Sequence, residues 1–190
     1  MLQIFISYSR QIQDMAKTLI QDFESLGHTV WFDQELTGGQ VWWDQVLLRI
    51  RECDLFVFVL APEALDSPAC KLEYTYAFSL HKTILPILVA DGVSINLLPP
   101  ALSIIQFVDY RRLDRHAAFA LIKALNNLPT PQPLPDPLPE PPEAPISYLG
   151  KLKIQIETMA NLSLASTVIG QNFLKKRRFV RGRVISCGKL

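Results

Sequence analysis

Short apolar runs and amphipathic stretches alternate along the first 128 residues of the 190-residue chain. The apolar runs are rich in β-branched and aromatic residues, a pattern that predicts strands. The run LFVFVL at 55–60 has no polar position, which is typical of a strand buried on both faces. We expect five strands, at residues 3–7, 29–32, 55–60, 83–89 and, from a weaker pattern, 104–108.

The stretches between these runs place apolar residues three and four positions apart, the spacing of a helix with one buried face. In 11–26 the apolar residues fall on one stripe, and Gly27 follows, where a glycine commonly ends a helix. Farther along, Ser67 and Pro68 suit the N-cap and the first position of another helix. We expect helices over 11–26, 41–51, 69–80 and 115–128.

Strand and helix alternate five times in this part of the chain. That order predicts an α/β fold with a doubly wound, five-stranded parallel sheet and helices on both faces. In such folds the functional residues gather at the carboxyl ends of the strands. The predicted strands place residues 7–10, 33–40, 61–67 and 90–94 there.

Proline and charge divide the chain into three parts. Nine of the fourteen prolines lie between 129 and 145, where neither helix nor sheet can form because proline fixes φ and lacks an N–H. Residues 1–128, 129–150 and 151–190 carry net charges of −4, −3 and +8, so the overall +1 is a cancellation. We expect a domain at 1–128, an extended acidic linker at 129–150 and a short, helical, basic segment at 151–190. For the segment at 129–150, the alternative to a spacer is a ligand for an SH3-type domain.

Composition narrows the class of protein. Apolar residues make up 49% of the chain, enough to bury a core. The three cysteines, Cys53, Cys70 and Cys187, are far apart and form no C-x-x-C pair, so we expect neither a zinc site nor a disulfide framework. The N-terminus reads as a strand instead of a signal peptide, and no apolar run is long enough to span a bilayer. We expect a soluble, cytoplasmic protein.

Several common catalytic motifs are absent. Gly38-Gly39 is the only glycine pair, and no G-x-G-x-x-G or Walker pattern surrounds it. Kinases, P-loop enzymes and ordinary dinucleotide dehydrogenases are therefore disfavoured. The chain also lacks the G-x-S-x-G elbow of α/β-hydrolases.

Four segments in order resemble those of the Toll/interleukin-1 receptor (TIR) domain family. They are IFISYS at 4–9, the spacing D-x-x-L-x-x-G-x-x-x-W from Asp33 to Trp43, LFVFVLAP at 55–62, and S-x-x-C-x-x-E from Ser67 to Glu73. The second spacing is that of bacterial members. Many members carry tryptophan where this chain has Ala69. The resemblance covers residues 1–128 and implies a flavodoxin-like fold.

The resemblance implies two functions. Some TIR domains cleave the nicotinamide–ribose bond of NAD+, giving linear or cyclic ADP-ribose, and Glu73 matches their catalytic glutamate. NAD+ is then the substrate, and no further cofactor is needed. The resemblance to bacterial members implies a role in antiphage defence and activation by self-association. Other TIR domains are non-catalytic adaptors that bind one another, here through the loop at 34–41. We favour the enzyme.

The chemistry is compatible with a single carboxylate. Most glycosidases need two, because the leaving alkoxide must be protonated. Nicotinamide leaves as a neutral pyridine, so one carboxylate beside the ribose is enough to stabilise the cationic transition state. On the predicted helix Glu73 borders the apolar stripe, where partial burial would raise its pKa. The alternative is a solvated helix glutamate.

The remaining candidates come with structural alternatives. Ser7, Tyr8 and Arg10 follow the first strand, where Arg10 would pair with a diphosphate and Tyr8 would stack on a base; a loop arginine and a packing tyrosine are equally compatible. The other three are Asp33, Trp43 and Cys70. For these we favour a turn-forming aspartate, a core tryptophan and a small buried cysteine over ligand contacts.

The segment at 151–190 shows two short amphipathic patterns followed by a basic end, LKKRRFVRGRVISCGKL. Such helices suit packing on a partner, which the sequence does not identify, or on their own copies. The basic end would suit nucleic acid or anionic lipid, but a solvated tail is the interpretation we favour.

Overall fold

A computed structural model describes residues 1–32, 40–94, 98–99, 102 and 105–145. Five strands form one sheet in the order β2-β1-β3-β4-β5, and all four neighbouring pairs are parallel. The strands are β1 (Gln3–Ser7), β2 (Thr29–Phe32), β3 (Leu55–Leu60), β4 (Thr83–Leu88) and β5 (Val108–Asp109). This arrangement confirms the predicted doubly wound, flavodoxin-like fold.

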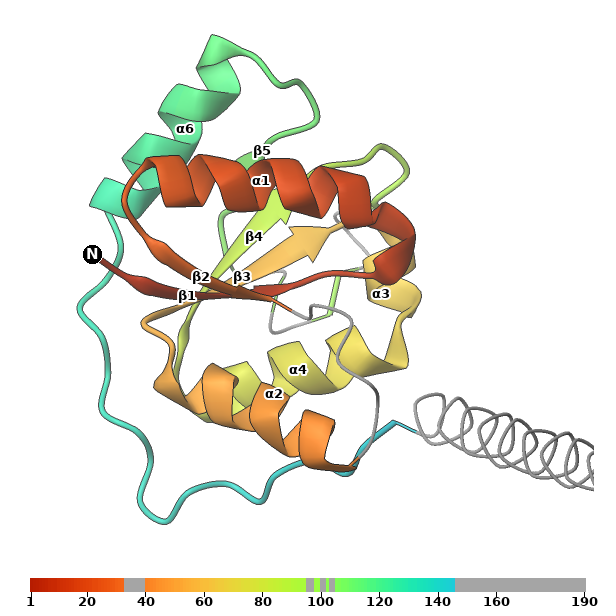
Figure 1. Cartoon of the computed structure of the whole chain (residues 1–190), viewed down its shortest axis with the longest axis vertical. Coiled ribbons are helices and arrows are strands. Elements are labelled where there is room, and N and C mark those ends of the chain that lie inside the picture. The colour runs from red at the N-terminus through yellow and green to blue at the C-terminus, as the bar shows by residue number, and fades with distance from the viewer. Residues whose placement is uncertain (33–39, 95–97, 100–101, 103–104, 146–190) are drawn as a thin grey trace, which may run out of the picture. The chain divides into compact units, whose positions relative to one another are not determined.

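Helices cover both faces of the sheet (Figure 1). On one face lie α1 (Gln13–Ser25), preceded by the short 3-10 helix η1 (Arg10–Ile12), and α6 (Arg115–Asn126). The other face carries α2 (Gln40–Glu52) and α4 (Pro68–Ser79). The short α3 (Pro62–Asp66) connects β3 to α4.

The core follows from the apolar pattern of the strands. Every residue of β3 is buried, as its continuous apolar run predicted. On one face of the sheet the ring of Phe5 stacks on Phe56 and Trp31, with centroids 5.4 and 5.1 Å away. On the other face, α1 buries its apolar stripe against the strands. Each large buried side chain contributes roughly 1.5–3 kcal/mol, so the sheet is a firm support for residues at its edges.

Most predicted elements have the expected bounds, with two differences. The fifth strand is only Val108–Asp109, whereas the pattern predicted 104–108. It is this short because it pairs only with Ile87 and Leu88 of β4. The helix α3 was not predicted, although Pro62 occupies its first turn, a position that proline favours. Gly27 has φ +83° after α1 and confirms the predicted helix end.

The chain divides into two compact units, residues 1–145 and 146–190. The second unit lies outside the described residues, so its predicted helices remain predictions. Residues 129–145 have neither helix nor strand, as their prolines predicted, and they group with the first unit. Within the described part of the chain, no helix has the length and apolar character needed to span a membrane.

Candidate functional site

The sheet order reverses at β1, which lies between β2 and β3. In open parallel sheets of this kind, ligands bind beyond the carboxyl ends of the strands at such a reversal, because the connecting loops diverge there. Ser7 is the last residue of β1 and pairs in register with Phe58 of β3. The place favoured for a ligand is therefore the edge at Ser7.

A buried carboxylate lies at this edge. Glu73 of α4 is only 6% exposed and Ser7 only 1%. The Ser7 hydroxyl donates a hydrogen bond of 2.5 Å to Glu73 Oε2, although the two residues are 66 positions apart in sequence. Hydroxyl–carboxylate bonds of this length are among the stronger ones in proteins. The bond fixes the carboxylate relative to the end of β1.

The start of α4 explains why Glu73 faces inward. Ser67 is the N-cap, and its hydroxyl accepts from the backbone N–H of Cys70 at 3.3 Å, with Pro68 in the first turn as predicted. Cys70 and Ala77 are both buried, three residues before and four residues after Glu73. Since positions three and four apart share a helix face, the glutamate falls on the buried face.

Cys70 lies in the same cluster. It is 2% exposed, and burial raises the pKa of its thiol to about 12, with the Glu73 charge adding to the rise and the hydroxyls of Ser67 and Ser7 opposing it. A thiol with such a pKa stays protonated near neutral pH and is a poor nucleophile. This environment supports the packing alternative for Cys70.

The other predicted site residues lie in different surroundings. Tyr8 is 9% exposed and packs in the core cluster that includes Ile4 and Ile6, whereas Arg10 is exposed in η1. Trp43 of α2 is completely buried, and its indole N–H donates to the carbonyl of Pro142 at 2.7 Å. Asp33 and most of the 34–41 loop lie outside the described residues.

Sequence reasoning missed one further carboxylate at this side of the sheet. Glu63 is in α3, directly after β3, and its Oε2 atom is buried with no hydrogen-bond partner among the described residues. A buried acceptor without a partner costs free energy, so it is a place where a donor from a ligand would be stabilised. Pro62, which favours the start of a helix, was the only feature of the sequence that pointed to Glu63.

Comparison with known proteins identifies the family. The sequence profile described as "TIR domain" matches residues 4–123, which is more than half of the chain. The chain belongs to the TIR domain family. No curated protein sequence matches it significantly.

One solved structure agrees with the TIR fold. The TIR domain of the Toll-related receptor TRR-2 from Hydra magnipapillata is 19% identical with a TM-score of 0.54, covering 65% of this chain and 98% of that one. The CMP N-glycosidase BcmB of Clostridium botulinum is also 19% identical, with the same coverages and a TM-score of 0.47. At this identity the first likeness shows the fold alone.

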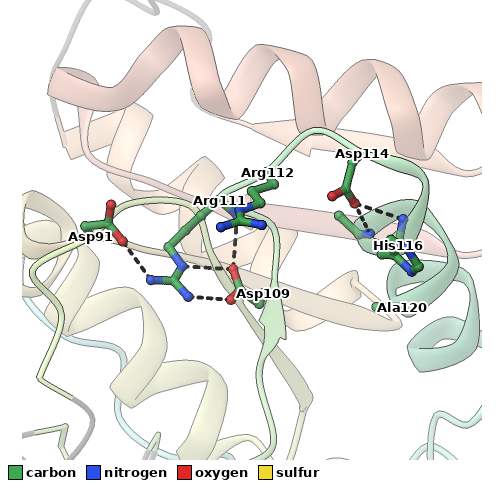
Figure 2. Close-up of a pocket in the computed structure, with 8 residues that line it drawn as sticks. Asp91, Asp109, Arg111, Arg112, Asp114, His116 and Ala120 are labelled. Atoms are coloured by element: carbon green, nitrogen blue, oxygen red, sulfur yellow. Dashed lines mark hydrogen bonds and ion pairs between the residues drawn. The ribbon is translucent and has the colours of Figure 1, made fainter.

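A hollow of about 620 Å³ lies elsewhere on the TIR domain, beyond the ends of β4 and β5 (Figure 2). Three of its charged groups bind one another. The Arg111 guanidinium donates to Asp91 at 2.7 Å and to both carboxylate oxygens of Asp109 at 2.9 and 2.5 Å, and these bonds lower the pKa of Asp109 to about 2. Glu73 and Ser7 are not among its lining residues. We therefore place the candidate site at Glu73, despite the volume of this hollow.

Proposed function

We propose that this TIR domain cleaves the bond between nicotinamide and ribose in NAD+, with Glu73 as the catalytic carboxylate. The observation that supports the proposal is the buried Glu73 carboxylate, held by Ser7 at the reversal of the sheet order. Family resemblance supplies the substrate, and the geometry supplies the reason why this glutamate is suited to the reaction.

The reaction places particular demands on the carboxylate. As the glycosidic bond breaks, its electron pair leaves with the pyridine nitrogen, so nicotinamide departs neutral and the ribose becomes cationic. A carboxylate beside the ribose stabilises this charge, more strongly in a buried site than in water. Water then bonds to the cationic carbon and loses a proton to solvent, giving linear ADP-ribose, or a nitrogen of the same molecule's adenine bonds there, giving cyclic ADP-ribose.

Ser7 would position the carboxylate. A carboxylate has about four lone-pair directions, and we expect a ribose hydroxyl to donate to one that Ser7 does not use. With the carboxylate already fixed, little reorganisation is needed when the substrate binds. Glu73 thus combines two properties of a catalytic group, burial and fixed orientation.

Self-association is the proposed means of control. We expect low activity in the dilute protein, because constant NAD+ loss is toxic, and higher activity when TIR domains assemble through the 34–41 loop. In the cell this would suit an antiphage effector that depletes NAD+ on infection.

The test measures the free nicotinamide that the purified 190-residue chain releases from NAD+, over a range of protein concentrations. Glu73→Gln keeps the size of the side chain but removes its charge, and should lower the rate by roughly 10²- to 10⁴-fold. Glu24→Gln, which changes an exposed glutamate on α1, is the matched control and should retain the wild-type rate. Chromatography of the products separates linear from cyclic ADP-ribose.

Two results would contradict the proposal. Equal rates for wild type and Glu73→Gln would remove Glu73 from the mechanism. A folded wild-type protein that self-associates but releases no nicotinamide at any concentration would instead be a TIR–TIR interaction module.

A further inference from the structure

The proline-rich segment at 129–145, here called the strap, returns to the domain instead of leaving it. It starts after α6 on one face of the sheet and reaches the first turn of α2 on the other face (Figure 1). Most of its first ten residues are exposed, whereas Pro142 and Ala144 are half-buried and Pro145 is buried. The contact with the domain is therefore concentrated at the end of the strap.

One hydrogen bond defines this contact. The indole N–H of Trp43 donates to the carbonyl of Pro142 at 2.7 Å, across 99 positions of sequence. Trp42 lies beside it, with the two ring centroids 5.8 Å apart. Aromatic rings that present an N–H to the carbonyls of an extended proline-rich chain are the means by which SH3 and WW domains bind their ligands.

The strap has the properties of such a ligand. Proline restricts the free chain to conformations close to the bound one, so little conformational entropy is lost on docking. Trp43, in turn, is completely buried, and a buried indole N–H without an acceptor would cost free energy. The tryptophan and the strap thus complement each other in hydrogen bonding.

We propose that the first turn of α2 carries a binding site for a polyproline segment, centred on Trp43, which residues 139–145 of the same chain occupy as a releasable ligand. Because the strap is tethered, its effective concentration at the site is on the order of millimolar. A weak contact is then enough to keep it docked, and it can still be displaced by a competing proline-rich segment. The inference does not depend on NAD+ cleavage.

The first experiment uses the wild-type chain and needs no variant. A Glu-specific protease cuts the bond between Glu143 and Ala144, which lies between the hydrogen-bonded Pro142 and the buried Pro145. Proteases need several extended residues in their cleft, so docking should slow this cut by at least about tenfold relative to the free peptide of residues 136–150. Equal rates in the chain and the peptide would overturn the proposal.

The second experiment empties the site. Residues 139–145 are replaced by a Gly/Ser segment of equal length, and the peptide of residues 136–145 (DPLPEPPEAP) is titrated while tryptophan fluorescence is followed. The peptide should bind this variant but bind the wild-type chain at least about tenfold more weakly, because the wild-type strap competes. Equal binding to both proteins, or no binding to the variant, would overturn the proposal.

Matched controls distinguish specific recognition of the proline-rich peptide from nonspecific binding. The same peptide with alanine in place of its prolines should lose binding, because it loses the extended conformation. Trp43→Phe in the strap-replaced chain keeps an aromatic ring but lacks the indole N–H, and should weaken binding about tenfold, whereas Trp31→Phe on β2 should not. Nicotinamide release from the same proteins is recorded separately, so failure of the proposed enzyme activity leaves these outcomes unchanged.

Discussion

At the Glu73 site a serine hydroxyl holds a buried carboxylate, whereas in the hollow over β4 and β5 a guanidinium holds two exposed ones. Both regions lie at the carboxyl ends of strands in one sheet. In the hollow, solvent screens the charges and Arg111 pairs with both carboxylates, so little electrostatic effect is left for a ligand. At Glu73 the carboxylate is shielded from water, where its charge acts strongly on a neighbouring group. Burial and orientation therefore identify the reactive site better than the volume of a cavity.

The largest expected difference between the two regions is in thiol reactivity. Burial raises the pKa of Cys70 from 9.0 to about 12, which lowers its thiolate fraction about a thousandfold at a given pH. Ala120 lines the open hollow, so an Ala120→Cys variant provides an exposed thiol for comparison. With iodoacetamide at pH 8, peptide mapping should show that the introduced thiol is alkylated at least about a thousandfold faster than Cys70. Similar rates would mean that the Glu73 surroundings are open to solvent.

The next effect concerns activity. Ser7→Ala removes the hydroxyl that fixes Glu73, and the loss of orientation should lower kcat about 10- to 100-fold. KM should change little, because Ser7 acts through the carboxylate. Asp91→Asn, which removes a carboxylate from the hollow, should leave both constants at their wild-type values. A loss of activity in Asp91→Asn equal to that in Ser7→Ala would move the site to the hollow.

Substitutions in the two regions should differ by a smaller amount in their effect on the free energy of unfolding. Ser7→Ala alone removes the hydroxyl that donates to the buried Glu73 carboxylate and should lower the free energy of unfolding by roughly 1–3 kcal/mol. Replacing both partners, as in Ser7→Ala/Glu73→Met, removes the buried polar pair and should restore stability to about the wild-type level or above it. Asp91→Asn should change it by no more than about 0.5 kcal/mol. Urea unfolding of the four proteins measures these differences, and a double variant less stable than Ser7→Ala would contradict them.

The fold was predictable because its signals are local. The continuous apolar run of β3, the Gly27 helix end and the Ser67–Pro68 helix start each depend on a few adjacent residues, and the structure confirms all three. The two-residue β5 was not predictable in its bounds, because its length depends on how much of β4 it can pair with.

The candidate site was predictable only in part. The family spacing S-x-x-C-x-x-E and the helical stripe pointed to Glu73 at the edge of the buried face, and the end of the first predicted strand pointed to Ser7. No local pattern indicates that the Ser7 hydroxyl reaches the Glu73 carboxylate. That contact joins residues 66 positions apart and requires the register of β1 on β3. The contact of Trp43 with Pro142 was hidden for the same reason: the prolines predicted an extended chain but not its course.

The smallest expected effect is the pH dependence of the hollow. Hydrogen bonds from Arg111 lower the pKa of Asp109 from 3.8 to about 2, so the charged carboxylate binds protons less readily in the folded protein than in the unfolded chain. Its stabilising contribution is therefore complete above about pH 4 and is lost as the pH falls from about 4 towards 2. Asp109→Asn should melt slightly below wild type at pH 6, and most of this small gap should be lost by pH 2. The gap should also shrink in 1 M salt, because exposed ion pairs are screened. A gap that stays constant from pH 6 to pH 2 would mean that Asp109 stabilises the fold through packing, and that the charges of the hollow are less tightly paired than those bonds indicate.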